Sequence, residues 1–91
     1  MNAGRVERIR AALSALQPIR LEIRDDSAKH AGHAGARDGR GHFSVVIVSV
    51  AFEGLSLIQR HKRVYSAMGA LMDTDVHALA ISAKTPEEAG A

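Results

Sequence analysis

Hydrophobic residues repeat at helical spacing in the first part of the chain and then change to strict alternation. The residues on the expected helical stripe are Val6, Ile9, Leu13 and Leu16. This spacing is typical of a helix with one buried face, and Pro18 ends it because proline cannot donate the next helical hydrogen bond. Residues 19–24 (IRLEIR) then alternate apolar and charged side chains. That alternation predicts a strand with one face buried and the other in water.

The middle of the chain changes from a glycine-rich segment to a long apolar run. Residues 25–42 contain four glycines and three histidines, a composition typical of a mobile loop. Residues 43–52 (FSVVIVSVAF) are apolar at most positions on both faces of an extended chain. This pattern predicts a central strand. Glu53 and Gly54 make the turn that follows.

A second helical stripe and a third strand complete the pattern. The stripe contains Leu57, Ile58, His61, Val64, Tyr65, Met68, Leu71 and Met72, so the pattern predicts a short turn leading into a longer helix with these residues on its buried face. The sequence DTD at residues 73–75 breaks this helix, and residues 76–84 (VHALAISAK) are expected to form a strand. Thr85 and Glu88 have the spacing of a capping box, which predicts a helical stub over residues 85–91.

The expected fold is therefore one α/β domain spanning residues 1–91, in the order α-β-β-α-β with a terminal stub. The first two strands should pair antiparallel, and the second and third should pair parallel through a right-handed crossover. This mixed, three-stranded sheet places the loop and the start of the third strand at the same end. We therefore expect His30, His33, His42 and His77 to gather there.

His61 is expected to lie apart from these four histidines. It precedes Met72 by eleven residues, which corresponds to roughly 16 Å along a helix. Because it lies on the apolar stripe, a structural histidine within the core is the favoured interpretation. Its neighbours Arg60, Lys62 and Arg63 are expected to face away from the core, either in water or against phosphate or an acidic partner.

Composition limits the class of protein. The chain has 91 residues, five histidines and no cysteine. It therefore cannot form a disulfide, and it could hold iron only by sharing ligands with another molecule. Charged residues in the first ten positions and the lack of a long apolar segment favour a cytoplasmic protein that does not enter a membrane. No nucleophile elbow, phosphate loop or paired-carboxylate site is recognisable, so an enzyme is not expected.

Four blocks in a characteristic order resemble the BolA family over essentially the full chain. They are DDSAKHAGHAG, HFSVVIVSVAFEG, QRHKRVYSAM and VHALAISAKTPEE. The resemblance implies a small α/β fold similar to the type II K-homology module. The chain departs from the family pattern in two places: the usual RHR is RHK here, and the family's longer C-terminal tail is nearly absent.

The resemblance implies a non-enzymatic adaptor that forms a heterodimer with a monothiol glutaredoxin and is a monomer when alone. The two proteins would share a [2Fe–2S] cluster, with glutathione, in iron–sulfur trafficking or in iron and stress sensing. By resemblance, His77 is a ligand, with His30 or His33 from the loop as its companion. The loop histidines could equally be solvated, whereas for His42 a structural or solvent-facing position is favoured.

The alternative implied by the same family is a DNA-binding transcriptional regulator of morphology and stress genes. Duplex DNA would then contact the basic residues Arg60, Lys62 and Arg63, and its affinity would fall with salt. No Gly-X-X-Gly loop stands between Gly54 and Arg63, and the chain has only three aromatic residues. Both observations argue against recognition of single-stranded nucleic acid.

Overall fold

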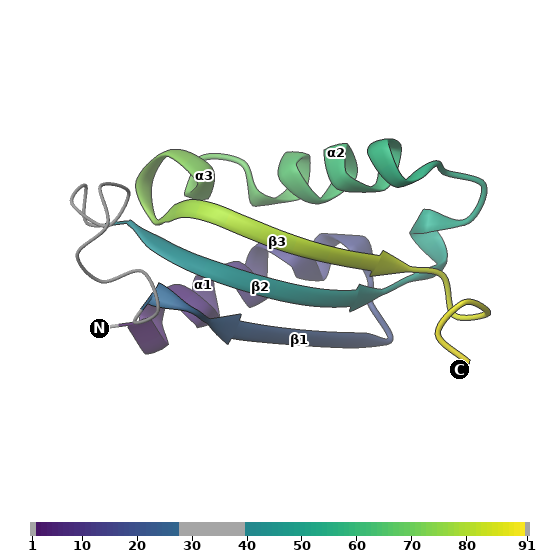
Figure 1. Ribbon diagram of the computed structural model, residues 1–91, viewed down its shortest axis with the longest axis horizontal. Coiled ribbons are helices and arrows are strands. Elements are labelled where there is room, and N and C mark those ends of the chain that lie inside the picture. Colours follow the sequence, from purple (N-terminus) through teal and green to yellow (C-terminus); the bar gives the residue numbers. More distant parts are fainter. Residues whose placement is uncertain (1, 28–39, 91) are drawn as a thin grey trace.

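The computed structural model describes residues 2–27 and 40–90, with side chains described from Gly4 onward. The elements along the chain are α1 (Asn2–Leu13), η1 (Ser14–Leu16), β1 (Arg20–Asp25), β2 (Gly41–Val48), η4 (Val50–Phe52), α2 (Leu57–Met68), α3 (Leu71–Thr74) and β3 (Val76–Lys84). The strand order is β1-β2-β3, with β1 and β2 antiparallel and β2 and β3 parallel. This architecture confirms the expected mixed sheet and its connections (Figure 1).

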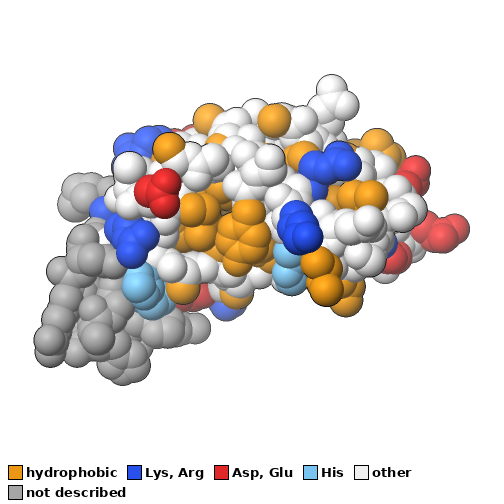
Figure 2. Space-filling view, turned by 90° about the horizontal axis from the view of Figure 1, so that it is seen from above, with side chains coloured by type: hydrophobic (Ala, Val, Ile, Leu, Met, Phe, Trp, Pro, Cys, Tyr) orange, Lys and Arg blue, Asp and Glu red, His pale blue; other side chains and the backbone are white. Residues whose placement is uncertain are grey.

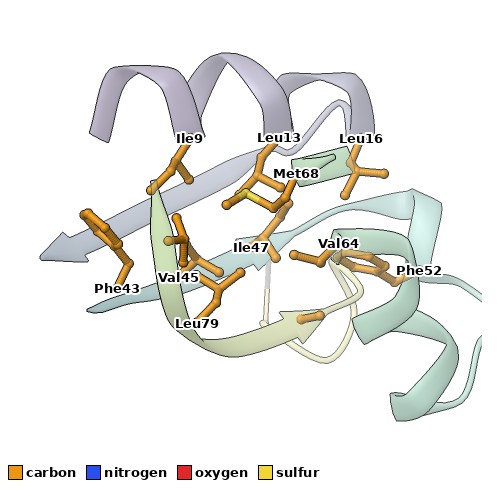
Figure 3. Packing of buried hydrophobic residues seen from close by; sticks show 12 residues of the cluster. Ile9, Leu13, Leu16, Phe43, Val45, Ile47, Phe52, Val64, Met68 and Leu79 are labelled. Atoms are coloured by element: carbon orange, nitrogen blue, oxygen red, sulfur yellow. The ribbon is translucent and has the colours of Figure 1, made fainter. Parts of the chain in front are cut away.

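Both long helices pack on one face of the sheet. The core combines Ile9 and Leu13 of α1 with Val64 and Met68 of α2, and the residues of β2 that alternate toward this face join them (Figure 3). On β1, Leu21 and Ile23 pack against the core as predicted, and the charged residues between them are exposed. Ile19, which was predicted to share this buried face, precedes the strand and is 60% exposed. The result is a two-layer domain in which the opposite face of the sheet carries the charged residues of β1 next to Ser44 and Val46 of β2.

Two of the expected elements are shorter than predicted. Strand β2 ends at Val48, because Ser49 accepts a hydrogen bond from the amide of Ala51 and thereby caps the short helix η4. The long helix ends at Met68, where Gly69 adopts a φ of 55°. The stretch predicted as one helix up to residue 72 is therefore divided into α2 and α3.

The predicted buried face of α2 was wrong in its orientation. Val64 and Met68 are buried as expected, but Leu57 and Ile58 are 67% and 70% exposed. Instead of facing away from the core, Arg60 is only 8% exposed. Two adjacent stripes of side chains run along α2. The stripe that contains Arg60 faces the sheet, because the fold supplies acceptors for the Arg60 guanidinium.

The acceptors of Arg60 come from three different segments. Its Nε donates to the carbonyl of Leu55 at 3.0 Å, and Nη1 donates to the carbonyl of Ala83 at 3.1 Å. Nη1 and Nη2 also bind the two carboxylate oxygens of Glu88 at 2.6 and 3.0 Å. A buried arginine is tolerated when it is paired with a carboxylate and hydrogen-bonded in this way.

The C-terminal segment forms the predicted capping contacts without a regular helix. The amide of Thr85 donates to Glu88 at 2.9 Å, and the amide of Glu88 donates to the Thr85 hydroxyl at 3.2 Å. Residues 86–90 are turns rather than the expected stub. The Glu88 side chain therefore both caps this turn and binds Arg60.

Candidate functional site

The candidate site is built on an irregularity at the start of β3. In the parallel pairing, Gly41 lies opposite Val76 and His42 lies opposite Ala78, so His77 is an extra residue in the ladder. Such a bulge redirects side chains. Here the residues on both sides of the bulge, Val76 and Leu79, are buried, while His77 and Ala78 are exposed. The bulge therefore presents the His77 imidazole at the end of the sheet.

The neighbouring strand enters this end through a glycine that has no room for a side chain. A Cβ atom on Gly41 would lie 2.6 Å from Cε2 of Phe43 and 2.7 Å from the Ser27 hydroxyl. That hydroxyl accepts a hydrogen bond from the His42 amide at 3.1 Å. The close packing of Gly41, Ser27 and Phe43 fixes the register in which β2 begins.

Asp75 anchors the other side of the site to the first helix. Its carboxylate binds Nη2 of Arg8 at 2.5 Å and lies 3.5 Å from Nε of Arg5, and its carbonyl accepts the Gly41 amide at 2.9 Å. Hydrogen bonds from Thr74 and Arg8 hold the pKa of the Asp75 carboxyl below its usual value. Asp75, which directly precedes Val76 and His77, is thus bound to both α1 and β2.

Two side chains at the entry to β2, those of Arg40 and His42, lie next to the His77 ring. The guanidinium of Arg40 lies against it, with Nη2 3.2 Å from Nδ1 of His77 and Nη1 donating to the carbonyl of Met72 at 3.0 Å. The ring of His42 lies at a centroid distance of 5.2 Å from that of His77, tilted by 49°. The predicted meeting of His42 and His77 is therefore confirmed.

The remaining predicted histidines lie elsewhere. His30 and His33 fall outside the described residues, so their approach to His77 stays a prediction. His61 is half-buried beside Ile81 and Lys84, at the far end of β3 from His77. Its separation from the site is confirmed, but it is not part of the core cluster as the apolar stripe had indicated. Figure 2 shows histidine side chains at two separate places along the molecule.

The basic cluster is divided by the orientation of α2. Arg60 is engaged inside the fold, whereas Lys62 and Arg63 are exposed and line a shallow hollow with Leu55, Gln59 and Ser66. Exposed Tyr65 and Leu57 lie on the same helix, and hydrophobic and basic side chains occur together on the face seen in Figure 2. The cations available to a partner on this helix are therefore Lys62 and Arg63.

The described residues at this end of the sheet include imidazoles, which are potential metal ligands. Among the described residues, no group of three or more histidine, cysteine, aspartate or glutamate side chains is arranged to hold a metal ion. His77 offers an exposed imidazole, and imidazole can replace thiolate on one iron of a two-iron cluster. The other ligands would have to come from outside the described part of the chain.

Comparison with known proteins identifies the family. The family model for BolA-like proteins matches residues 13–88. The chain belongs to the BolA family. Its relatives include the chloroplastic protein BOLA1 of Arabidopsis thaliana, 46% identical over 89 residues, which cover 93% of this chain and 56% of that protein. The DNA-binding transcriptional regulator BolA of Escherichia coli is 41% identical over 83 residues, 90% of this chain and 76% of the relative.

The solved structures of the BolA family agree with the fold. The BolA domain of SufE1 from Arabidopsis thaliana has a TM-score of 0.81 at 44% identity, covering 92% of this chain and 94% of that domain. Three curated relatives that the chain matches are longer proteins, of which it spans between 24% and 62%. No helix in the described part of this BolA-family chain is long and apolar enough to cross a bilayer.

Arg40 is the residue at this site that the sequence analysis missed. It stands among glycines and one other arginine in GARDGRGHF, a stretch without periodicity. Its place two residues before His42 is a weak signal, because the contact with His77 depends on the parallel pairing of β2 and β3. The pairing register, rather than any local motif, brings Arg40 to the imidazole.

Proposed function

We propose that this protein is a non-enzymatic adaptor that binds a monothiol glutaredoxin and shares a [2Fe–2S] cluster with it through His77. The observation that carries the proposal is the exposed His77 imidazole on the β3 bulge, at the end of the sheet where the segment with His30 and His33 connects to β2. Iron–sulfur trafficking or iron and stress sensing in the cytoplasm is the corresponding role.

The chain's own residues would contribute ligands and position, and the partner would contribute thiolates. His77 would supply one imidazole, and His30 or His33 would be its companion. The glutaredoxin cysteine and glutathione would complete the iron coordination, because this chain contains no cysteine. A cluster with mixed imidazole and thiolate ligands has a higher reduction potential than an all-thiolate one.

Visible circular dichroism of a cluster-loaded monothiol glutaredoxin tests this proposal. Adding the wild-type protein should change the spectrum of the cluster, because an imidazole replaces one of its ligands. The variant His77→Ala should abolish most of that change, whereas His61→Ala should retain it, since His61 lies at the far end of β3. Single variants of His30 and His33 would then identify the companion ligand.

Two results would contradict the adaptor proposal. One is a cluster spectrum that does not respond to the wild-type protein at all. The other is a response that is the same for the wild type and His77→Ala. Backbone amide spectra of both histidine variants provide the control for folding.

The second candidate function is binding of duplex DNA through α2. It is favoured by the exposed cations Lys62 and Arg63 and by the 41% identity to a relative described as a DNA-binding transcriptional regulator. Arg60 contributes to this proposal only through the fold, because its guanidinium binds Glu88 and two carbonyls.

Fluorescence anisotropy with a labelled duplex distinguishes this function from the first. Each phosphate contact adds about one unit to the slope of log affinity against log salt concentration. The double variant Lys62→Gln, Arg63→Gln should therefore bind more weakly and reduce the slope by about two units. Arg20→Gln, an exposed arginine on β1, is the control for loss of charge. An unchanged slope in the double variant would exclude α2 as the DNA contact.

A further inference from the structure

The contact between Arg40 and His77 restricts the protonation of the imidazole. A guanidinium has five N–H donors and no acceptor. With Nη2 of Arg40 3.2 Å from Nδ1 of His77, the hydrogen bond requires Nδ1 to be the acceptor. The proton of the neutral ring is then on Nε2. We infer that Arg40 is a positioning residue that holds His77 in the Nε2–H tautomer and has to leave before His77 can coordinate iron.

Both ways of binding a metal are incompatible with this contact. If iron binds Nδ1, it takes the lone pair that Arg40 occupies. If iron binds Nε2, the proton of the neutral ring moves to Nδ1, and two N–H donors then face each other. Ligating histidines normally donate their other N–H to a carboxylate or carbonyl, which a guanidinium cannot replace. The inference rests on the proposed ligand role of His77.

The surroundings keep Arg40 in place without help from the imidazole. Its Nη1 donates to the carbonyl of Met72 at 3.0 Å. The next residue, Gly41, donates its amide to the carbonyl of Asp75 at 2.9 Å. Both the side chain of Arg40 and the backbone of the next residue are therefore hydrogen-bonded to the segment that leads into β3. The ring of His42 also lies close to that of His77, so two residues of the same strand entry are next to the imidazole.

The expected consequence is competition between Arg40 and the metal for His77. Replacing Arg40 by glutamine removes the restriction, because an amide side chain can donate to Nδ1 or accept from Nδ1–H. Since the contact is exposed to solvent, we expect the apparent affinity for the shared cluster to rise about threefold to tenfold in Arg40→Gln. Arg40→Lys should behave like the wild type because a lysine ammonium also only donates.

The first test uses the isolated protein and requires no cluster. Long-range ¹H–¹⁵N correlation spectra of the imidazoles, recorded at mildly alkaline pH, report which ring nitrogen carries the proton. Wild type and Arg40→Lys should show His77 as the Nε2–H tautomer alone. Arg40→Gln should show a mixture of tautomers. Arg24→Gln is the matched control, since it removes an exposed arginine that binds Asp26 and Ser44 instead of His77.

The second test measures binding to the cluster-loaded glutaredoxin by the visible spectrum. An increase in affinity for Arg40→Gln, with no increase for Arg40→Lys or Arg24→Gln, supports the inference. A His77 tautomer that is the same in the wild type and Arg40→Gln overturns it. If Arg40→Gln changes the His77 tautomer without any gain in affinity, the claim that Arg40 leaves His77 on binding is wrong.

The two proposals fail in different experiments. If His77→Ala leaves the cluster spectrum unaltered, the ligand role of His77 is wrong. The tautomer in the isolated protein then still decides whether Arg40 positions the ring. A purely structural role of Arg40 would lower the stability of Arg40→Gln but leave the His77 tautomer as it is in the wild type.

Discussion

At the scale of single residues, Gly41 is the position with the least tolerance for change. An added Cβ would lie within 2.6 Å of the Phe43 ring and 2.7 Å of the Ser27 hydroxyl, and neither neighbour can move freely in the packed strand entry. We predict that Gly41→Ala lowers the free energy of unfolding by about 1–3 kcal/mol. Urea denaturation measures this loss, and amide shifts of His42 and His77 should report the displaced strand entry.

A second glycine provides the control for Gly41. In Gly4→Ala, the new methyl group meets only the end of the flexible Arg8 side chain, at 3.3 Å. Because alanine favours helix over glycine by about 0.5–1 kcal/mol, this substitution in α1 should be neutral or stabilising. Equal destabilisation by both substitutions would show that crowding at Gly41 is not the cause.

At the scale of secondary-structure elements, the Arg60–Glu88 pair joins α2 to the C-terminal turn. Hydrogen bonds from Arg60 and from the Thr85 amide lower the pKa of Glu88 from 4.5 to about 2. The folded state therefore gains stability from ionised Glu88 above pH 4.5, and this stability is lost as the pH falls toward about 2. We predict that Glu88→Gln lowers the urea midpoint at neutral pH and that the difference from the wild type disappears in this acidic window.

The neighbouring glutamate separates this effect from a general loss of charge. Glu87 is exposed, and Glu87→Gln should leave the urea midpoint close to that of the wild type. Arg60→Met should destabilise the protein more than Lys62→Met, because Glu88 and two carbonyls lose their donors. If Lys62→Met is equally harmful, Arg60 is not the residue that holds the C-terminal turn.

The same pair shows where the sequence was insufficient to predict the element. The spacing of apolar residues predicted α2 as a helix, and the structure confirms it over Leu57–Met68. It could not show which of two adjacent stripes is buried, since Arg60 is favourable inside only when Leu55, Ala83 and Glu88 supply acceptors. Two of these acceptors, the Ala83 carbonyl and the Glu88 carboxylate, lie 23 and 28 residues away along the chain, so hydrophobicity alone favoured the wrong stripe.

At the scale of the whole molecule, strand connectivity was predictable because it follows from the order of the elements. A loop without a crossover helix favours an antiparallel pair and a crossover helix favours a parallel one, which is enough to bring His42 and His77 together. The bulge at His77 and the contact with Arg40 depend on the exact register between β2 and β3. The hydrophobic pattern restricts the register of a strand, but a one-residue shift such as the one at His77 depends on how the two strands pack.

Asp75 connects the start of β3 to the first helix, since its carboxylate binds Arg8 of α1 across 67 positions of sequence. Hydrogen bonds from Thr74 and Arg8 lower its pKa from the ordinary value of 3.8. The resulting stability is present above that value and is lost as the pH falls through the lower, folded-state pKa. We predict that Asp75→Asn costs about 1 kcal/mol at neutral pH and progressively less below pH 3.8, measured by urea denaturation. Asp73→Asn, two residues earlier on α3, should cost little at any pH. Because Asp75 also leads directly into the bulge, its loss should shift the His77 amide resonance, whereas Asp73→Asn should leave that resonance in place.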